Sequence, residues 1–338
     1  MLAGRPVSSG NQRNTPLANT IKDPDSFADA FLLAAYATAA TQRLGLAVST
    51  DAIRRGPAEL MQTMLTLASA TDGRVALTLG AGELKQAKPF GYKRSEGLRR
   101  LEDHLKISRR LLECDEPFDF DGHHWAYRQA WIGAGKLRRP EIWTMGGGPK
   151  LAELSAKYAD GWSTAIPNAF FTPDAFGKEV KRIKDLLERN GRDPDDFTFG
   201  IWATVMLHND PEVLEHAMSN PLVKYMAAAF GRLNQADWEV EGIEPVYPRD
   251  WHYALKLLPA QESPEKVDAI VAQTPVEMCR RGWFWGNPKE VASSIQAYVD
   301  AGATWVSVGD MMPLLLPVEH APASIDRQIE TCRILKQG

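Results

Sequence analysis

The sequence predicts an α/β protein built on a parallel sheet, because short apolar runs alternate along the chain with helix-length segments. Three of these runs end abruptly in glycine or an acid, within Gly73 to Glu83, Arg139 to Pro149 and Ala301 to Asp310. Such runs are typical of strands buried on both faces. In an α/β barrel, ligands bind at the carboxyl ends of the strands, where glycine lets the backbone approach a ligand closely. We therefore expect a ligand site at the carboxyl ends of these strands.

Each element follows from a local pattern. Apolar, β-branched or aromatic runs predict six strands: Leu44 to Val48, Val75 to Leu79, Ile142 to Met145, Gly161 to Ile166, Phe197 to Leu207 and Trp305 to Val308. Alanine-rich or charged segments, three of which begin with proline, predict helices. These helices are Ser26 to Ala40, one from Pro57, Leu98 to Leu112, Pro149 to Tyr158 and Pro173 to Glu188. The helix from Pro57 has Leu60, Met64 and Leu67 on one face.

The last helix has the clearest signals. Asn287, Pro288 and Glu290 form a capping box with proline in the first turn, and Gly302 ends the helix. Before it lies a long insertion, about residues 210–282, rich in Trp, Tyr and Pro. The six predicted strands are two fewer than a closed (β/α)8 barrel needs.

Composition excludes several classes of protein. A net charge of −4 provides no basic field, which argues against a nucleic-acid partner. Three scattered cysteines predict neither a disulfide framework nor a zinc site and suit a cytoplasmic protein. No apolar run reaches the roughly 20 residues of a membrane span, and the amino terminus has no signal-peptide core. No metal site is expected, because HExxH and CxxC patterns are absent from the sequence.

Gly146, Gly147 and Gly148 form the first candidate site, between a predicted strand and a helix opened by Pro149. Backbone N–H groups at a helix start favour an anion such as phosphate. The loop lacks the third glycine of the dinucleotide fingerprint and the Gly-Lys-Ser/Thr of a Walker loop. A tight strand-to-helix turn is the alternative.

Glu83 is the candidate catalytic residue, directly after Gly80-Ala81-Gly82. A partly buried acid at a barrel mouth has its pKa raised by desolvation, which suits proton donation. The alternative is a helix-capping or salt-bridged glutamate, with Lys85 or Arg99 as partner.

Other polar residues favour structural roles. Arg54 and Arg55 fit loop anchors better than phosphate ligands. His123 and His124 are adjacent, so on an extended segment they face opposite ways. His208 and Asp310 follow strands and either line the mouth or bond to loop backbone. Five aromatic residues in and just after the insertion favour core or interface positions over a cofactor cage: Trp238, Trp251, Tyr253, Trp283 and Trp285. A role walling an apolar substrate pocket is the alternative.

Four segments together resemble the luciferase-like family of flavin- and deazaflavin-dependent oxidoreductases: residues 44–83, KPFGY (Lys88 to Tyr92), residues 139–162 and residues 286–310. The resemblance runs from about Asp23 to the carboxyl terminus. It is greatest to the coenzyme F420 branch, which includes phthiodiolone ketoreductases and methylenetetrahydromethanopterin reductases. It implies a single (β/α)8 barrel domain over residues 1–338, a homodimer and a deazaflavin in the barrel mouth.

The resemblance also implies site residues. Ala47, Val48, Gly82, Met145 and the Gly146–Gly148 loop would bind the cofactor, the loop holding its phosphate. Family members carry a cis peptide bond in the strand that matches Ala47-Val48. Val48 would then lie behind the deazaflavin ring. Glu83 matches the position of a carboxylate proton donor. The family's first strand, helix and second strand, with an acid-His pair and a Trp, have no counterpart here, so we expect an N-terminally shortened barrel.

Three hypotheses follow. The leading one is an oxidoreductase that transfers hydride between reduced F420 and a carbonyl-type carbon of an apolar or lipid-like small molecule. The second keeps the fold but uses FMN, as a monooxygenase. The third is a non-catalytic, shortened barrel subunit.

Overall fold

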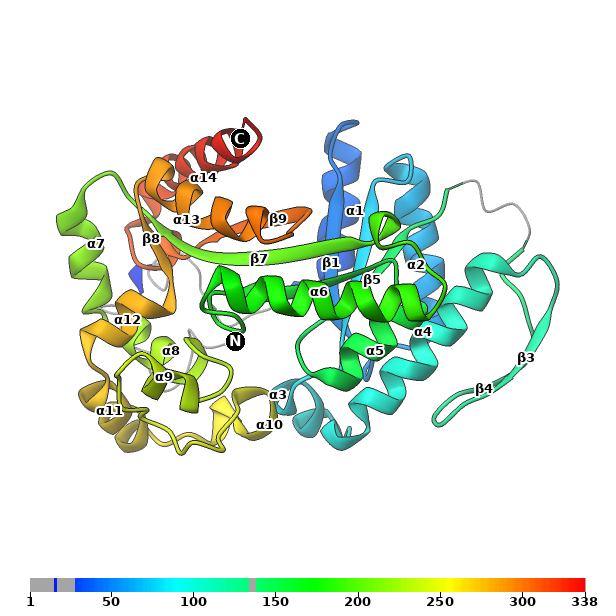
Figure 1. Cartoon of the computed structure of the whole chain (residues 1–338), viewed down its shortest axis with the longest axis horizontal. Coiled ribbons are helices and arrows are strands. Elements are labelled where there is room, and N and C mark those ends of the chain that lie inside the picture. The colour runs from blue at the N-terminus through cyan, green and yellow to red at the C-terminus, as the bar shows by residue number, and fades with distance from the viewer. Residues whose placement is uncertain (1–14, 17–27, 134–137, 338) are drawn as a thin grey trace. The chain divides into compact units, whose positions relative to one another are not determined.

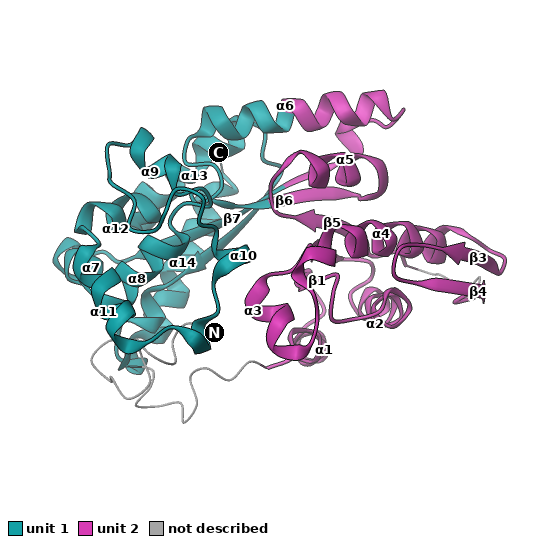
Figure 2. Ribbon diagram, turned by 90° about the horizontal axis from the view of Figure 1, so that it is seen from below, with its two compact units in different colours: residues 1–27, 164–180, 200–338 teal, residues 28–163, 181–199 magenta. Residues whose placement is uncertain are grey.

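The computed structural model describes residues 15–16, 28–133 and 138–337, and the chain divides into two compact units (Figure 2). Unit 2 consists of residues 28–163 and 181–199. Unit 1 consists of residues 164–180 and 200–337 together with the described residues near the amino terminus. Three elements belong partly to each unit: β6 (Gly161–Ile166), α6 (Pro173–Arg189) and β7 (Thr198–Leu207).

Unit 2 contains parallel strands in the order β1–β2–β5–β6, followed in Figure 1 from blue to green. The strands are β1 (Leu46–Asp51), β2 (Val75–Gly80), β5 (Glu141–Met145) and the start of β6. An antiparallel hairpin, β3 (Phe118–Asp121) with β4 (Ala126–Ala130), is separate from them. The helices are α1 (Ala30–Ala40), α2 (Pro57–Ala70), α3 (Leu84–Ala87), α4 (Gly97–Glu113) and α5 (Pro149–Tyr158), with short 3-10 turns at Lys88–Phe90, Arg94–Glu96 and Pro194–Asp196.

Unit 1 contains β7 paired in parallel with β8 (Phe284–Gly286) and with β9 (Trp305–Asp310). Its helices are α7 (Pro211–Met218), α8 (Pro221–Phe230), α9 (Ala236–Val240), α10 (Tyr253–Lys256), α11 (Pro264–Gln273), α12 (Val276–Gly282), α13 (Pro288–Asp300) and α14 (Ala321–Leu335). Short 3-10 turns lie at Pro259–Gln261, Met312–Leu314 and Val318–His320.

Helix α2 shows why the local predictions succeeded. Proline occupies its first turn, and the predicted apolar face is buried, with Leu60 and Met64 fully inaccessible and Leu67 nearly so. Burying each such side chain contributes about 1.5–3 kcal/mol to folding. The capping box of α13 is also present, because Asn287 accepts from the N–H of Glu290 while the Glu290 carboxylate accepts from the N–H of Asn287.

The strand count needs correction. The described part of the chain contains seven parallel strands rather than six, because β8 follows the insertion directly. Its three residues, Phe284–Gly286, are too few for a periodicity to be visible. The β3–β4 hairpin was also missed. Strand β1 ends at Asp51 rather than Val48, since its pairing with β2 continues to Asp51 opposite Gly80.

The insertion is helical, from α7 to α12, and its apolar side chains share one core with Met206 of β7 and with Met311 and Met312 after β9. Trp238 and Trp283 are buried in this core, as the core interpretation predicted. Trp251 stacks on Tyr247 with ring centroids 3.8 Å apart. The buried guanidinium of Arg232 lies 4.5 Å from the Trp238 ring and bonds Glu241 at 2.7 Å.

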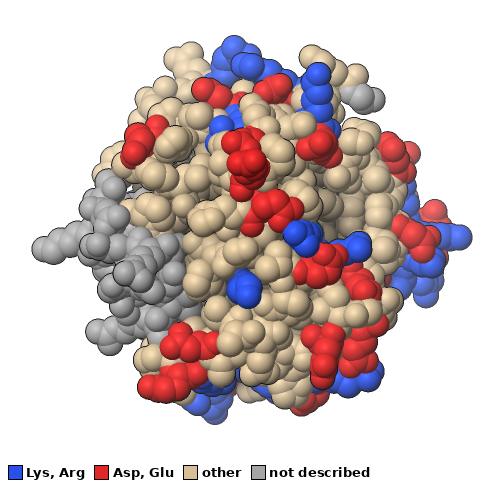
Figure 3. Space-filling view, turned by 90° about the vertical axis from the view of Figure 1, so that its left-hand side faces the viewer, with Lys and Arg blue, Asp and Glu red and all other residues tan. Residues whose placement is uncertain are grey.

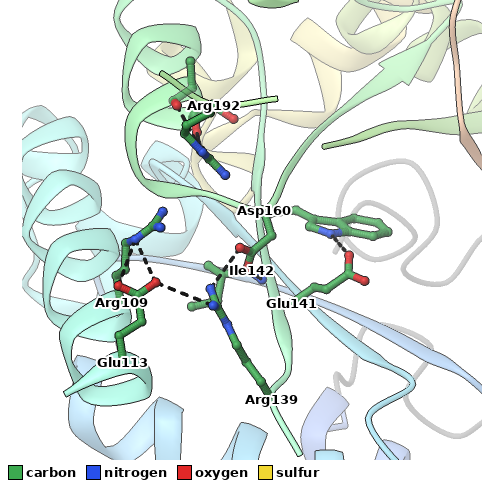
Figure 4. Close-up of polar contacts among 10 residues, drawn as sticks. Arg109, Glu113, Arg139, Glu141, Ile142, Asp160 and Arg192 are labelled. Atoms are coloured by element: carbon green, nitrogen blue, oxygen red, sulfur yellow. Dashed lines mark hydrogen bonds and ion pairs between the residues drawn. The ribbon is translucent and has the colours of Figure 1, made fainter. Parts of the chain in front are cut away.

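An ion-pair network joins the beginnings of the strands of unit 2 (Figure 4). Arg139 contacts Asp160 at 2.9 Å and Glu113 at 3.5 Å, and Glu113 also pairs with Arg109. The Asp160 carboxylate accepts from the N–H of Ile142 at 2.9 Å, at the start of β5. This network fixes the amino-terminal ends of β5 and β6, the end at which barrel residues serve stability.

The surface carries mixed charge. Figure 3 shows acidic and basic side chains interspersed among uncharged ones on the face that it draws. Among the described helices, none is both long enough and apolar enough to cross a membrane.

Candidate active site

The site begins with strand register. Asp51 lies opposite Gly80, and Gly80 lies opposite Met145, so the carboxyl ends of β1, β2 and β5 meet at one edge of unit 2. Met145 lies opposite Ser163 in β6. The hydroxyl of Ser49 donates to the sulfur of Met145 at 3.4 Å. Because side chains alternate along a strand, Ser49 and Met145 mark the face of the strands that carries the candidate site.

The loop after β2 is shaped by two glycines. Gly82 has φ 80°, and a Cβ there would lie 2.7 Å from the Ile53 side chain. A Cβ on Gly97, the first residue of α4, would lie 1.9 Å from the carbonyl oxygen of Ala81. The start of helix α4 therefore packs directly on the backbone of Ala81, two residues before Glu83.

Glu83 forms an ion pair with Lys85, the partner that the sequence had suggested as one alternative. The Glu83 side chain is 24% exposed and that of Lys85 only 11%. Arg94 is a second cation beside it: burial lowers the pKa of the Arg94 guanidinium, and the charge of Glu83 opposes that shift. Arg94 was not among the residues predicted for the site, although it follows Glu83 closely in a segment rich in lysine.

The Gly146–Gly148 loop has the geometry of an anion cradle. The N–H of Gly146 donates to Ser163, and Gly148, with φ 98°, is the N-cap of the ten-residue helix α5 without any side-chain cap. A Cβ on Gly147 or Gly148 would meet no heavy atom within 4 Å. The loop thus has open space beside the positive, amino-terminal end of a helix. A phosphate group would fit such a place.

Ala47 and Val48 lie in the middle of β1. Val48 is 5% exposed and pairs with the buried Leu77, on the face opposite Ser49. The expected cis peptide at Ala47-Val48 is wrong: among the described residues the cis bond is Ile166-Pro167. The register of β1 on β2 is unbroken through both residues, and a cis bond before a non-proline residue costs about 3–4 kcal/mol.

Arg54 and Arg55 are structural anchors, as predicted. Arg54 binds the Asp51 carboxylate at 2.6 Å, and Arg55 pairs with Asp29. His124 donates its backbone N–H to Asp103 at 2.7 Å. No cluster of three or more potential metal ligands occurs among the residues that the structure describes.

Comparison with known proteins decides the family. The Luciferase-like monooxygenase family model matches residues 15–304. The chain belongs to this family.

Its relatives are oxidoreductases. The chain is 27% identical over 276 residues to the phthiodiolone/phenolphthiodiolone dimycocerosates ketoreductase of Mycobacterium tuberculosis (strain ATCC 25618 / H37Rv), covering 78% of this chain and 68% of the relative. It is 24% identical over 275 residues to the F420-dependent glucose-6-phosphate dehydrogenase of Kineococcus radiotolerans, covering 78% and 70%. The luciferase-like chain is therefore an enzyme, and the hypothesis of a non-catalytic subunit is not supported.

A solved structure agrees on the fold. An F420-dependent secondary alcohol dehydrogenase, in complex with an F420-acetone adduct, superimposes with a TM-score of 0.65 at 19% identity, covering 85% of this chain and 80% of that one. The fold is thus the α/β barrel type of the luciferase-like family, as predicted.

In unit 1 of this luciferase-like chain, His208 and Asp310 bond to backbone, which was one of the two alternatives that the sequence left open. The ring nitrogen Nδ1 of His208 accepts from the N–H of Asp210 at 3.0 Å. Asp310 accepts from the N–H groups of Leu207 and Met312 at 3.1 and 3.0 Å. Burial raises the pKa of Asp310 to about 6.

Proposed function

We propose that this enzyme uses coenzyme F420 to transfer hydride between the deazaflavin and the carbonyl-type carbon of an apolar small molecule. One observation carries the proposal: Glu83 and the Gly146–Gly148 loop follow the paired strands β2 and β5, at the same edge of the strands. A proton-transfer group and an anion cradle at one barrel edge are what a phosphate-bearing hydride cofactor requires. Two named relatives or neighbours depend on F420.

The residues have separate roles in this proposal. The Gly146–Gly148 loop holds the cofactor phosphate, while Ala47, Gly82 and Met145 line the place of the ring. Val48, for which the family resemblance implied the same role, is buried on the opposite face of β1 and takes no part in it. When bound, the cofactor supplies or accepts the hydride. Glu83 moves the proton that accompanies the hydride to or from the substrate oxygen.

The apolar substrate is supported by two features. A ketoreductase of dimycocerosate lipids is among the relatives. Trp251 of the insertion and Trp285 of the adjoining strand β8 are aromatic side chains that are only partly buried.

The cradle is tested with a matched pair of variants at Gly147, whose Cβ direction is open. Gly147→Asp places a carboxylate where phosphate would bind, and we expect F420 affinity to fall at least about tenfold, equivalent to about 1.4 kcal/mol. Gly147→Asn has the same shape without the charge and should lose much less. Equal losses in the two variants, measured by fluorescence titration, would remove the phosphate role.

Glu83 is tested through turnover. Glu83→Gln removes the proton-transfer group and should lower kcat by about 10²–10⁴-fold. F420 affinity should stay within about twofold of the wild type. A large loss of F420 binding with little change in kcat would sink the proton-transfer role.

The family description as monooxygenase keeps FMN as the second candidate. Oxygen consumption with reduced FMN separates the two, because a deazaflavin reductase should turn over without consuming oxygen.

A further inference from the structure

The first residue of the Gly146–Gly148 loop is held by two bonds from β6. The N–H of Gly146 donates to the carbonyl oxygen of Ser163 at 3.1 Å. The carbonyl oxygen of Gly146 accepts from the indole Nε1 of Trp162 at 2.9 Å. Trp162 is fully inaccessible to solvent, and a hydrogen bond is stronger in such surroundings than in water. Both backbone polar groups of Gly146 are therefore fixed by one neighbouring strand.

Strand register explains how the indole reaches this carbonyl group. Thr144 of β5 lies opposite Trp162 of β6, so their side chains share one face of the strands, and Gly146 follows Thr144 by two residues. On this face the Thr144 hydroxyl donates to the Ser155 hydroxyl of α5 at 2.8 Å. The Ser155 hydroxyl donates to the carbonyl oxygen of Gly161 at 3.2 Å. Trp162 thus lies on the face that α5 covers, and it contacts the loop from that side.

Fixing the Gly146 carbonyl also fixes the direction of the next N–H group. Among the described residues the cis peptide bond is Ile166-Pro167, so the bond between Gly146 and Gly147 is trans. In a planar trans peptide the C=O and N–H groups point in opposite directions. The N–H of Gly147 therefore points away from the Trp162 indole. Among the described residues, the structure records no hydrogen-bond partner for this N–H or for that of Gly148.

The orientation of this peptide decides whether the loop attracts or repels an anion. Glycines lie on both sides of the peptide, and glycine adopts either sign of φ, so the peptide can rotate at little steric cost. After such a rotation the carbonyl oxygen of Gly146 would take the place of the Gly147 N–H and would repel a phosphate. The bond from Trp162 holds the carbonyl on the opposite side.

We propose that Trp162 is a positioning residue: it holds the Gly146–Gly147 peptide in the orientation that presents the Gly147 N–H to the cofactor phosphate. This inference rests on the proposed function, because it assigns the phosphate to the three-glycine loop. Trp162 itself does not contact the cofactor in this proposal. It acts through the Gly146 carbonyl, so its loss should affect ligands that carry a phosphate and spare those that do not.

The first test compares F420 with the deazaflavin that lacks the phosphate and the tail attached to it, by fluorescence titration. Trp162→Phe keeps an aromatic ring and removes the N–H donor. We expect F420 binding to weaken by about three- to tenfold, as for one lost hydrogen bond, and binding of the shorter deazaflavin to change by less than about twofold.

Ser155→Ala is the matched control. It removes two buried hydrogen bonds between α5 and the strands but leaves the bond from Trp162 to Gly146 in place. This variant should lose stability and keep the wild-type ratio of the two affinities. Equal weakening of both ligands in Trp162→Phe, or an equal change of the ratio in Ser155→Ala, would show that Trp162 acts in packing alone and would overturn the proposal.

A different result would refute the proposed phosphate site itself. If the wild type binds F420 no more tightly than the shorter deazaflavin, the loop holds no phosphate, and the role of Trp162 is refuted with it. If Trp162→Phe does not fold, 3-benzothienylalanine is placed at position 162 instead. This tryptophan analogue has the shape of the indole, with sulfur in place of the N–H, and the same outcomes apply.

The second test needs no cofactor. Protein labelled with nitrogen-15 glycine is titrated with inorganic phosphate, and the NMR signal of Gly147 is identified by its loss in Gly147→Ala. In the wild type and in Ser155→Ala this signal should move as phosphate binds. In Trp162→Phe the midpoint should need at least about threefold more phosphate. Equal midpoints in the three proteins would contradict the proposal, whichever phosphate-bearing cofactor the enzyme uses.

Discussion

Gly97 has no room for a methyl group, since its Cβ would lie 1.9 Å from the Ala81 carbonyl oxygen. We predict that Gly97→Ala forces α4 away from residues 80–83 and lowers the free energy of unfolding by about 1–3 kcal/mol, the usual cost of overpacking. Turnover should fall as well, because the loop that carries Glu83 moves. Gly147→Ala, where the Cβ direction is open, is the control. Equal stability of the two variants in urea unfolding would contradict this packing argument.

We predict that Asp310 makes the free energy of unfolding depend on pH. Its pKa is raised from 3.8 to about 6 by burial, so the folded state holds a proton that the unfolded state has released. The contribution of Asp310 to the free energy of unfolding is therefore greatest below about pH 4. It is lost as the pH rises through about 6, and the total loss is at most about 3 kcal/mol. In Asp310→Asn this component should disappear.

The measurement is urea unfolding of both proteins at several pH values between about 4 and 8, where the difference in free energy between wild type and Asp310→Asn should change with pH. A difference that stays constant across this range would show that Asp310 is not held protonated by the fold.

Some of the candidate site residues could be predicted from the sequence, and others could not. Glu83 and the three-glycine loop were identified because an acid or glycines directly after an apolar run are visible in one segment. The ion pair of Glu83 with Lys85 was one of two partners considered, and Arg94 was not considered. Which cations face a carboxylate depends on the fold of the loop between β2 and α4, and no spacing rule describes that loop.

At the scale of elements, two arginine–glutamate pairs in the insertion make a controlled comparison. Arg232 pairs with Glu241 and Arg249 with Glu239, both at 2.7 Å, but the Arg232 side chain is 2% exposed and that of Arg249 70%. We predict that Arg232→Ala lowers the free energy of unfolding by about 3–5 kcal/mol, because Glu241 is left without its buried partner. Arg249→Ala should change it by less than about 1 kcal/mol.

Urea denaturation of the two variants checks this prediction. Similar effects would mean that burial of Arg232, including its bond to the carbonyl oxygen of Arg281, does not hold the insertion together.

Elements were predictable where their signals are local. The capping box of α13, the proline that opens α2 and the apolar run of β6 each lie within one short segment, and all three elements were found. Strand β8 has three residues and exists through its pairing with β7, and the end of β1 is set by β2. Strand bounds that depend on pairing with a distant strand cannot be predicted from the local sequence.

At the scale of the whole molecule, the family was recognisable because four segments keep their order and spacing, and the family model covers residues 15–304. The substrate could not be recognised from the sequence, because barrels of one fold catalyse many different reactions. A homodimer stays a prediction, which light scattering of the purified protein at several concentrations would decide.

The central claim is that the strand ends of unit 2 bind a deazaflavin, and parallel fluorescence titrations with coenzyme F420 and FMN test it most directly. We expect F420 to bind at least about tenfold more tightly than FMN, and Gly147→Asp to weaken F420 binding. Preference for FMN, or F420 affinity unaffected by Gly147→Asp, would contradict it.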